Sequence, residues 1–259
     1  MKKQTRKLTE RIEKRLTSLI LGQHPHNTIF SFNYHNVVHI NAFLREQAKR
    51  IGKVDTVTDV GAGRSPYYPI FGHLSENYIA VDLKESLPHK EHRKIKQLYG
   101  LAEDLPMQSQ SSDVVLSNQV LEHVINPEKA VNEVFRVLRP GGFIVGSVPH
   151  ISPVHLEPYD FRRFTDLGVQ KLMMDAGFSE IEVFGNGSIY RAFAFSMAMD
   201  WMLSSRRPGK AQYFSVRRAL LLSPLVGMLN LAAIVFEFIT RNKNRSAANL
   251  CWIARKPLV

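Results

Sequence analysis

The feature that most constrains the fold of this chain is the segment VDTVTDVGAGRS, Val54–Ser65, where a short apolar run enters a glycine-rich turn. The run is too short and too rich in β-branched residues for a helix, so it predicts a buried strand closed by Asp59. Gly61 and Gly63 lack a Cβ, which allows a sharp turn and lets the backbone lie directly against a ligand. An open α/β sheet binds ligands at this point, the carboxyl end of a strand.

A second strand of the same kind follows, in which the apolar run Tyr78–Val81 ends in Asp82. A carboxylate placed there can accept hydrogen bonds from both hydroxyls of a ribose. The glycine turn alone is a weak signal, and Asp82 alone could be a solvated carboxylate at a strand end. Ser65 and Pro66 stand where a dinucleotide fingerprint would continue toward its third glycine, which disfavours NAD.

The block Leu101–His150 narrows the class of ligand. In order, it holds an Ala-Glu-Asp-Leu-Pro turn, an Asp-Val-Val strand, Leu-Glu-His-Val, a helix start at Asn-Pro, and Arg-Val-Leu-Arg-Pro-Gly-Gly. This series resembles the central block of class I S-adenosylmethionine-dependent methyltransferases of the type 11 group, and the resemblance runs from about Val54 to Gly185. It implies a mainly parallel, seven-stranded, Rossmann-like α/β sheet with helices on both faces and an antiparallel last strand.

The resemblance also implies which residues hold S-adenosylmethionine. The glycine turn borders the methionine part, Asp82 the ribose, and the turn at Ala102 the adenine. The implied cofactor residues are Asp59, Gly61, Gly63, Asp82, Ala102, Glu103 and Asn118. Family members often carry an aspartate where this chain has Leu101, so Glu103, Asp104 or the backbone would have to bind the adenine amino group.

Methyl transfer is an in-line displacement, so catalysis can consist mostly of aligning donor and acceptor. A base is needed only when the acceptor is a hydroxyl, and histidine is suited to that task near neutral pH. We predict His123, in Leu-Glu-His-Val, and His155 as candidate catalytic residues. Each could instead be structural, as a pocket wall or a loop support.

The segment Pro149–Thr165 reads PHISPVHLEPYDFRRFT and follows a predicted strand. Its His-x-x-Pro-x-Asp-x-x-Arg-x-Thr pattern resembles a subgroup found among bacterial methyltransferases of surface-glycan and lipid-linked saccharide pathways. We predict substrate contacts from His150, Asp160 and Arg163, the arginine binding an anionic group such as a phosphate. A plain Asp160–Arg163 pair that shapes the loop is the alternative.

The remaining periodicity predicts strands that alternate with helices, and it sets the expected organisation. We expect helices over His35–Ile51, near Pro66–Leu74, from Asn126 to Leu138 and after Thr165, and strands at 96–100, 113–117, 143–148 and 181–184. The expected domains are a basic amphipathic segment at 1–34, a methyltransferase core at 35–188, a hydrophobic helical insertion at 189–246, and a final core strand and tail at 247–259.

The net charge of +11 indicates an anionic partner, and its position along the chain favours an anionic membrane surface. Met1–Leu21 predicts a basic amphipathic helix and lacks the continuous apolar core of a signal peptide. A helix packed on its own domain and a solvated tail are the alternatives. The single cysteine, Cys251, fits a reducing compartment and a buried strand position. No Cys/His spacing predicts a metal site.

The expected insertion holds two apolar segments, Ile189–Leu203 and Ala219–Ile239. The second has the roughly twenty residues that span a bilayer, but a single crossing would separate the last strand from its sheet. Two interpretations stay open, a monotopic hairpin that enters one leaflet and a helical cap over the active-site rim. Membrane contact would place the protein in the cytoplasm, peripheral or monotopic on the inner face of the cytoplasmic membrane.

These patterns predict an enzyme, an S-adenosylmethionine-dependent methyltransferase that acts on a small or lipid-linked acceptor, such as a saccharide hydroxyl, at the membrane surface. A nucleic-acid methyltransferase is an alternative suggested only by the charge, and no basic-aromatic stripe supports it. The Ser-Asn-Gln-Val after Asp113 also differs from the motif of base-amino methylases. Two further hypotheses are a non-catalytic scaffold with this fold and a nicotinamide oxidoreductase. The patterns do not name an oligomeric state.

Overall fold

The computed structural model describes residues 15–23, 26–88, 93–202, 216–241 and 246–258. The chain divides into two compact units. We call residues 40–150, 159–186 and 249–259 the sheet unit, and residues 1–39, 151–158 and 187–248 the helical unit. Each unit is described by itself.

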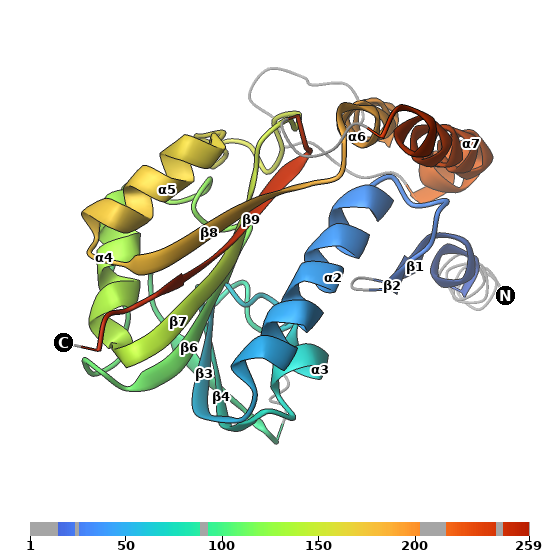
Figure 1. Cartoon of the computed structure of the whole chain (residues 1–259). Coiled ribbons are helices and arrows are strands. Elements are labelled where there is room, and N and C mark those ends of the chain that lie inside the picture. The colour runs from blue at the N-terminus through green and yellow to red at the C-terminus, as the bar shows by residue number, and fades with distance from the viewer. Residues whose placement is uncertain (1–14, 24–25, 89–92, 203–215, 242–245, 259) are drawn as a thin grey trace, which may run out of the picture. The chain divides into compact units, whose positions relative to one another are not determined.

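Within the described residues, the sheet unit contains a seven-stranded sheet with the order β5-β4-β3-β6-β7-β9-β8. Its strands are β3 (Val54–Val60), β4 (Ser75–Asp82), β5 (Ile95–Tyr99), β6 (Ser112–Asn118), β7 (Leu138–Pro149), β8 (Ser179–Asn186) and β9 (Asn249–Arg255). The pairs from β5 to β7 are parallel, and β9 is antiparallel to both β7 and β8. This arrangement confirms the predicted sheet with an antiparallel last strand (Figure 1).

Helices cover both faces of the sheet (Figure 1). On one face, α2 (Tyr34–Ile51) and α3 (Tyr68–Phe71) pack against apolar side chains of β3 and β6. On the other face, α4 (Pro127–Val137) and α5 (Asp166–Asp175) pack against the opposite side chains of the same strands. The alternating burial follows from the period-two geometry of strands, and it explains why the central strands read as nearly continuous apolar runs. The first residues of α2 belong to the helical unit.

The predicted helix starts are confirmed, and their caps explain them. The Asn126 side chain accepts a hydrogen bond from the Lys129 amide at 2.8 Å, ahead of a proline in the first turn. The Thr165 hydroxyl caps α5 in the same way through the Gly168 amide at 3.0 Å. Cys251 is buried in β9, as expected.

One boundary was predicted wrongly, namely the passage from α4 to β7. The pattern assigned Leu138 to the helix and began the strand at Phe143, but β7 begins at Leu138, which pairs with Ser112 of β6. The register shifts between Ser112 and Val114, and Gly141 has φ +79°, so the strand absorbs the Pro-Gly-Gly sequence as an irregularity. A proline is tolerated there because it stands near the start of the strand.

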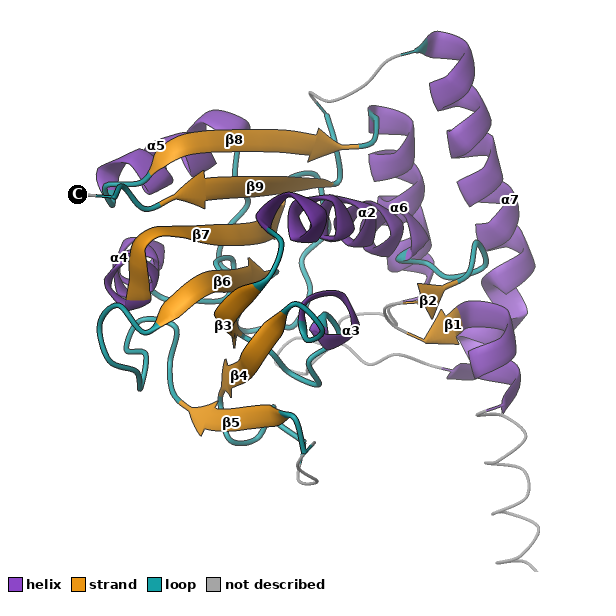
Figure 2. Ribbon diagram, turned by 60° about the horizontal axis from the view of Figure 1, so that its bottom comes forward, coloured by secondary structure: helices purple, strands orange, loops and turns teal. Residues whose placement is uncertain are grey.

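The helical unit contains α6 (Ile189–Met202) and α7 (Val216–Thr240), which lie side by side (Figure 2). A two-stranded hairpin, β1 (Gly22–Gln23) and β2 (His26–Asn27), follows a helical stretch at 15–21. Residues 1–14 of the predicted amphipathic helix lie outside the described residues. Among the described helices, α7 alone has the length and apolar composition to cross a membrane.

Candidate active site

The glycine turn after β3 leaves space on one side and none on the other. Gly61 has φ +67°, and an added Cβ would stand 2.4 Å from Cγ2 of Val120, so no side chain fits. Gly63 has φ +50°, and an added Cβ would meet nothing within 4 Å. The backbone at Gly63 therefore faces open space, while Gly61 lets the loop after β6 pack tightly against the turn.

Asp82, at the end of β4, holds this turn in place. Its Oδ2 accepts a hydrogen bond from the Gly63 amide at 2.8 Å, and its Oδ1 accepts one from the Leu83 amide at 2.7 Å. A carboxylate has about four acceptor positions, so two remain for other donors. Two ribose hydroxyls match that remaining capacity, and the residues present fit the nucleoside part of S-adenosylmethionine.

Asp59 lies behind the turn and is buried. Its Oδ2 accepts a hydrogen bond from the Tyr78 hydroxyl at 2.8 Å. Burial raises the pKa of Asp59 to about 7, the Tyr78 hydrogen bond opposes this rise, and the charge of Asp82 adds to it. A cation bound nearby would favour the ionised form of Asp59, so its protonation state can respond to a positively charged ligand.

The turn assigned to adenine is tied to the loop after β6. Oε1 of Glu103 accepts hydrogen bonds from the amides of Ile125, at 2.9 Å, and Asn126, at 3.4 Å. Ala102 packs against the core, while Leu101 is half exposed and bridges to Asp104. Glu103 therefore positions the loop that carries His123, a role that its sequence context did not reveal.

Asn118 ends β6 beside the glycine turn. Its Oδ1 accepts a hydrogen bond from the Ser147 hydroxyl at 3.0 Å. Its Nδ2 is buried and has no hydrogen-bond partner among the described residues. Because a buried donor without a partner is costly, this amide is suited to a ligand acceptor that enters the site.

Glu122 and His123 follow on the same loop. The Nδ1 of His123 lies 2.8 Å from the Tyr159 carbonyl oxygen. A carbonyl only accepts, so Nδ1 carries the proton and Nε2 is the basic nitrogen of the neutral ring. The Nε2 atom lies 3.7 Å from Oε1 of Glu122.

Glu122 is a residue that the sequence analysis missed. Its side chain is fully buried, and neither carboxylate oxygen has a hydrogen-bond partner among the described residues. Burial raises the pKa of Glu122 to about 8, with Asp160 adding to the rise and Arg163 opposing it. The available signal was an acidic residue inside the apolar run from Val120 to Val124. A carboxyl group that stays protonated near neutral pH is a common feature of functional sites.

The predicted substrate residues of the sheet unit lie directly after β7 and on the segment after residue 158. Asp160 and Arg163 form a bidentate ion pair at 2.7 and 2.6 Å, with the Asp160 carboxylate fully buried. His150 directly follows β7, with Nδ1 2.7 Å from the Phe164 carbonyl oxygen. The Phe161 amide donates to the Glu122 carbonyl, so this segment is attached to the loop of His123.

His155, the other predicted catalytic residue, belongs to the helical unit. Its Nδ1 lies 3.4 Å from the Pro153 carbonyl oxygen. The structure thus gathers the residues of the sheet unit around the ends of β3, β4 and β6, and describes His155 as part of a separate unit.

The strand order, the glycine turn after β3 and the carboxylate that ends β4 are features of the class I S-adenosylmethionine-dependent methyltransferase fold. Residues 58–146 match the family described as a methyltransferase domain. A relative from Mycolicibacterium smegmatis, described as a "probable S-adenosylmethionine-dependent methyltransferase", is 30% identical over 138 residues, which cover 50% of this chain and 54% of that protein. The chain therefore spans about half the length of the curated relatives it matches.

Solved structures show the same fold. A SAM-dependent methyltransferase from Archaeoglobus fulgidus has a TM-score of 0.53 and 15% identity, with 93% of this chain and 97% of that chain covered. The phosphoethanolamine N-methyltransferase 2 of Haemonchus contortus, solved with phosphomonomethylethanolamine and S-adenosylhomocysteine, has a TM-score of 0.50 and 13% identity, with 90% of this chain and 61% of that chain covered. The cofactor that these descriptions name is S-adenosylmethionine, and S-adenosylhomocysteine is its demethylated form.

Proposed function

We propose that this chain transfers a methyl group from S-adenosylmethionine to a small or lipid-linked acceptor, such as a saccharide hydroxyl, at the inner face of the cytoplasmic membrane. The observation that carries the methyl-transfer part is the Gly63–Asp82 hydrogen bond inside the family match. It joins the open side of the glycine turn to a carboxylate with spare acceptor positions.

When bound, S-adenosylmethionine supplies a methyl group on a positively charged sulfur, which is displaced in line. The residues of this chain have to bind the cofactor, orient the acceptor toward it and, for a hydroxyl acceptor, remove its proton. Asp82 and the turn at Gly63 hold the nucleoside, and Asn118 offers a buried amide to the same ligand. If the acceptor is a hydroxyl, its oxygen forms the new bond to carbon, the electron pair of the broken bond stays on sulfur, and the hydroxyl proton goes to a base.

His123 is the candidate for that base in the sheet unit. Its Nδ1–H group donates to the Tyr159 carbonyl, so the nitrogen that could accept a proton in the neutral ring is Nε2, which lies 3.7 Å from Oε1 of Glu122. His155 remains a second candidate, on the evidence of its sequence pattern alone. Arg163 is paired with Asp160, so an anionic acceptor would bind beside an arginine whose charge this carboxylate already balances.

The side chains of α7 support the membrane part of the proposal. Apart from Val226, its buried residues are small or polar, namely Ala219, Ser223, Gly227, Asn230 and Ala233. Eight of its large apolar residues are exposed, namely Leu221, Leu225, Met228, Leu231, Val235, Phe236, Phe238 and Ile239. A helix on a water-soluble protein shows the opposite pattern. Small residues inside and large apolar residues outside are typical of helices that face lipid.

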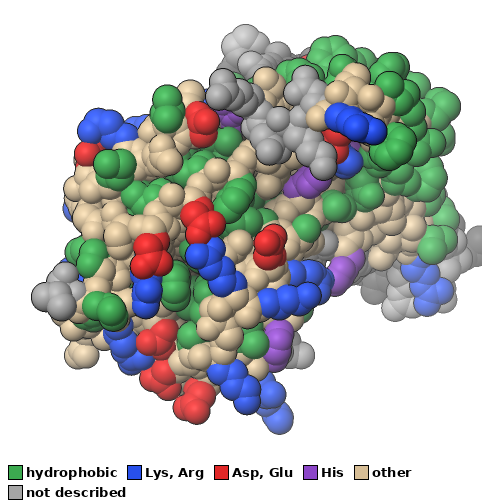
Figure 3. Space-filling view, viewed as in Figure 1, with side chains coloured by type: hydrophobic (Ala, Val, Ile, Leu, Met, Phe, Trp, Pro, Cys, Tyr) green, Lys and Arg blue, Asp and Glu red, His purple; other side chains and the backbone are tan. Residues whose placement is uncertain are grey.

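Apolar side chains also gather on the surface of this region, as Figure 3 shows over α6 and α7. An exposed apolar surface of this kind marks an interaction site. Basic residues stand at both ends of α7, with Arg217 and Arg218 in its first turn and Arg241 just after its end. Cations in those positions match the anionic lipids of a cytoplasmic leaflet.

Chain topology favours entry from one side. The chain leaves the sheet at β8, passes through α6 and α7, and returns to the same sheet at β9. The 14 residues of α6 span only about 21 Å at 1.5 Å per residue, less than the roughly 30 Å of a hydrocarbon core. Since α6 is too short to cross, the pair forms a monotopic hairpin, with both ends on one side.

The proposal is tested with purified protein, methyl-labelled S-adenosylmethionine, and lipid and aqueous extracts of the source cell. We expect label in a lipid-phase or saccharide product, and calorimetric binding of S-adenosylmethionine that is tighter than that of NADH. Binding of NADH in preference would contradict the methyltransferase function. Label found only in nucleic acid would contradict the proposed acceptor.

A further inference from the structure

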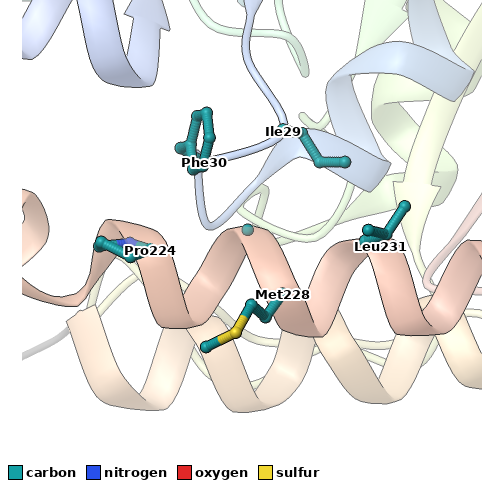
Figure 4. Close-up of a pocket in the computed structure, with 6 residues that line it drawn as sticks. Ile29, Phe30, Pro224, Met228 and Leu231 are labelled. Carbon is teal, nitrogen blue, oxygen red and sulfur yellow. The ribbon is translucent and has the colours of Figure 1, made fainter.

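An apolar groove lies within the helical unit, between the loop at Ile29–Phe30 and the middle of α7 (Figure 4). Its volume is about 340 Å³. The lining residues are Ile29, Phe30, Pro224, Gly227, Met228 and Leu231, so every one is apolar or glycine. The volume falls at the lower end of the range of about 300–1,000 Å³ that small-ligand pockets occupy.

Polar contacts outside the groove fix its two walls. The Nδ2 atom of Asn230, a fully buried residue, donates to the carbonyl oxygens of Ile29 at 2.7 Å and Ser31 at 3.1 Å. At Gly227 an added Cβ would stand 2.5 Å from Cδ1 of Phe30, so the ring packs directly on the helix backbone. The loop is therefore held against α7, and the groove is formed before any ligand binds.

The wall at Pro224 is built in the same way. A proline inside a helix has no amide hydrogen, so the carbonyl four residues earlier, that of Leu220, loses its usual donor. The hydroxyl of Ser223 donates to that carbonyl at 2.8 Å. Because Ser223 is buried, the replacement bond lies away from the groove, and the exposed ring of Pro224 presents only carbon to it.

The groove is open, and its walls are exposed to an unusual extent for apolar side chains. Phe30 is 42%, Leu231 54% and Met228 63% exposed. Exposed apolar surface of this kind is costly in water and indicates a ligand or a nonpolar surrounding. Other exposed apolar residues of α7, such as Leu225 and Val235, continue the same surface beyond the groove.

We propose that this groove binds one hydrocarbon chain of an anionic membrane lipid. The apolar lining suits a methylene chain, and Arg217 and Arg218 lie about 10 Å from Pro224 along the helix axis, at 1.5 Å per residue, where an anionic headgroup would meet them. The proposal rests on the membrane part of the proposed function and is independent of methyl transfer. It predicts that α7 binds an individual lipid chain at a defined site, in addition to contacting the bilayer.

The test is displacement of a dansyl-labelled fatty acid from the full chain by unlabelled fatty acids of increasing length, each below its micelle concentration. Affinity should rise about fourfold with each added methylene until the groove is filled, because each buried methylene contributes about 0.8 kcal/mol. Affinity that does not depend on chain length would overturn the proposal.

Variants locate the binding. Leu231→Trp and Met228→Trp place bulk in the groove and should each weaken fatty-acid binding at least tenfold. Leu221→Trp is the matched control, since Leu221 lies on the same helix, is 79% exposed and does not line the groove. It should change affinity less than twofold. Equal losses in Leu221→Trp and Leu231→Trp would show diffuse adsorption along α7 and contradict a groove site.

A photoactivatable fatty acid gives an independent location and guards against misfolded variants. Adducts in wild type should fall on the peptides that contain Phe30 and Met228, and Met228→Ser, which removes bulk, should keep the adduct at Phe30. Adducts confined to Phe236 and Phe238, or protection of Met228 by dimerisation without lipid, would overturn the proposal. Calorimetry with S-adenosylmethionine is run on the same samples, so failure of the methyltransferase function is recorded separately.

Discussion

In the sheet unit, large apolar side chains fill the core between the sheet and its helices, whereas many large apolar side chains of α7 are exposed. Trp252, Leu116 and Ile144 are fully buried in the sheet, and Thr58 shares a hydrogen bond with Ser112 at 2.6 Å. In α7, Phe238 is 82% exposed while Asn230 is fully buried. Both regions are rich in apolar residues, so they differ in where these residues lie. The sheet unit buries them away from water, and α7 exposes them as a surface suited to lipid.

The two units also differ in their buried titratable groups. In the helical unit Arg191 and Glu237 form an ion pair at 2.7 Å, beside His35 and His39. Burial, together with the charge of Arg191, lowers the pKa of His35 to about 3 and that of His39 to about 4, so both rings are neutral at neutral pH. The sheet unit instead buries carboxyl groups, which can respond to a cationic ligand. Near neutral pH, His35 and His39 of the helical unit therefore stay neutral, whereas Asp59 and Glu122 of the sheet unit can change their charge.

Among the predicted effects on the two units, the largest is a loss of cofactor affinity when Asp82, at the end of β4, is changed. Asp82→Ala removes the acceptor of two ribose hydroxyls, each worth about 1.5–3 kcal/mol when the acceptor is charged. Cofactor affinity should fall about 10²–10⁴-fold in calorimetric titration. Asp55→Ala is the control, because that exposed carboxylate pairs with Arg139 at the start of β3. Equal affinities for the two variants would remove Asp82 from the cofactor site.

The next effect concerns the acceptor side. His123→Ala should lower turnover about 10²-fold, at the low end of what a positioned base contributes, with cofactor affinity unchanged. His155→Ala is tested in parallel, and His73→Ala, an exposed histidine of the sheet unit, is the control. The measurement is kcat with saturating cofactor. A loss under threefold for both His123→Ala and His155→Ala would leave alignment of the substrates as the mechanism.

The carboxyl group of Glu122 should make the stability of the sheet unit depend on pH. Its pKa is raised from 4.5 to about 8 on folding, so the folded state binds the proton more tightly. The contribution of Glu122 to stability is then fully present below about pH 4.5 and is lost as pH rises toward 8, by at most about 1.4 kcal/mol per pH unit. Glu122→Gln cannot lose a proton at this side chain. In urea unfolding at several pH values, the free energy of unfolding of the variant should therefore rise relative to that of wild type as pH increases from about 4.5 to 8. A constant difference would show that folding does not change the pKa of Glu122.

Much of this fold could be predicted from the sequence, because its signals are local. A β-branched run, a glycine turn and an N-capping Asn126 each specify their own element. The start of β7 at Leu138 could not be predicted, since pairing with Ser112 overrides the helical pattern. For the site, the strand-end carboxylate Asp82 is local as well, whereas burial of Glu122 depends on segments far apart in the chain.

In the insertion at 189–246, the sequence likewise predicts the local element but not its packing. Hydropathy predicted an apolar segment at Ala219–Ile239, and α7 covers it. Its inverted pattern could not be read from the sequence, because apolar residues lie all around the helix and its faces are distinguished by packing against α6 and the loop at 29–31. Packing is what shows that Ser223 and Asn230 lie inside.

Flotation with anionic liposomes tests the central claim, that α7 presents its large side chains to lipid. A triple variant changes exposed residues of α7 to serine, namely Leu221, Leu225 and Phe238. A matched control changes three exposed apolar residues of the sheet unit to serine, namely Leu167, Met174 and Leu258. Each chain is floated at about 0.1 M and 1 M salt, where the Debye length falls from about 10 Å to about 3 Å.

We predict that wild type and the matched control float at both salt concentrations, with less than a threefold change between them, because hydrophobic insertion is not screened. The triple variant should stay at the bottom of the gradient at high salt while still binding S-adenosylmethionine. Release of wild type by salt, or flotation of the triple variant to the same extent as wild type at high salt, would contradict the claim and make α6 and α7 a packed cap.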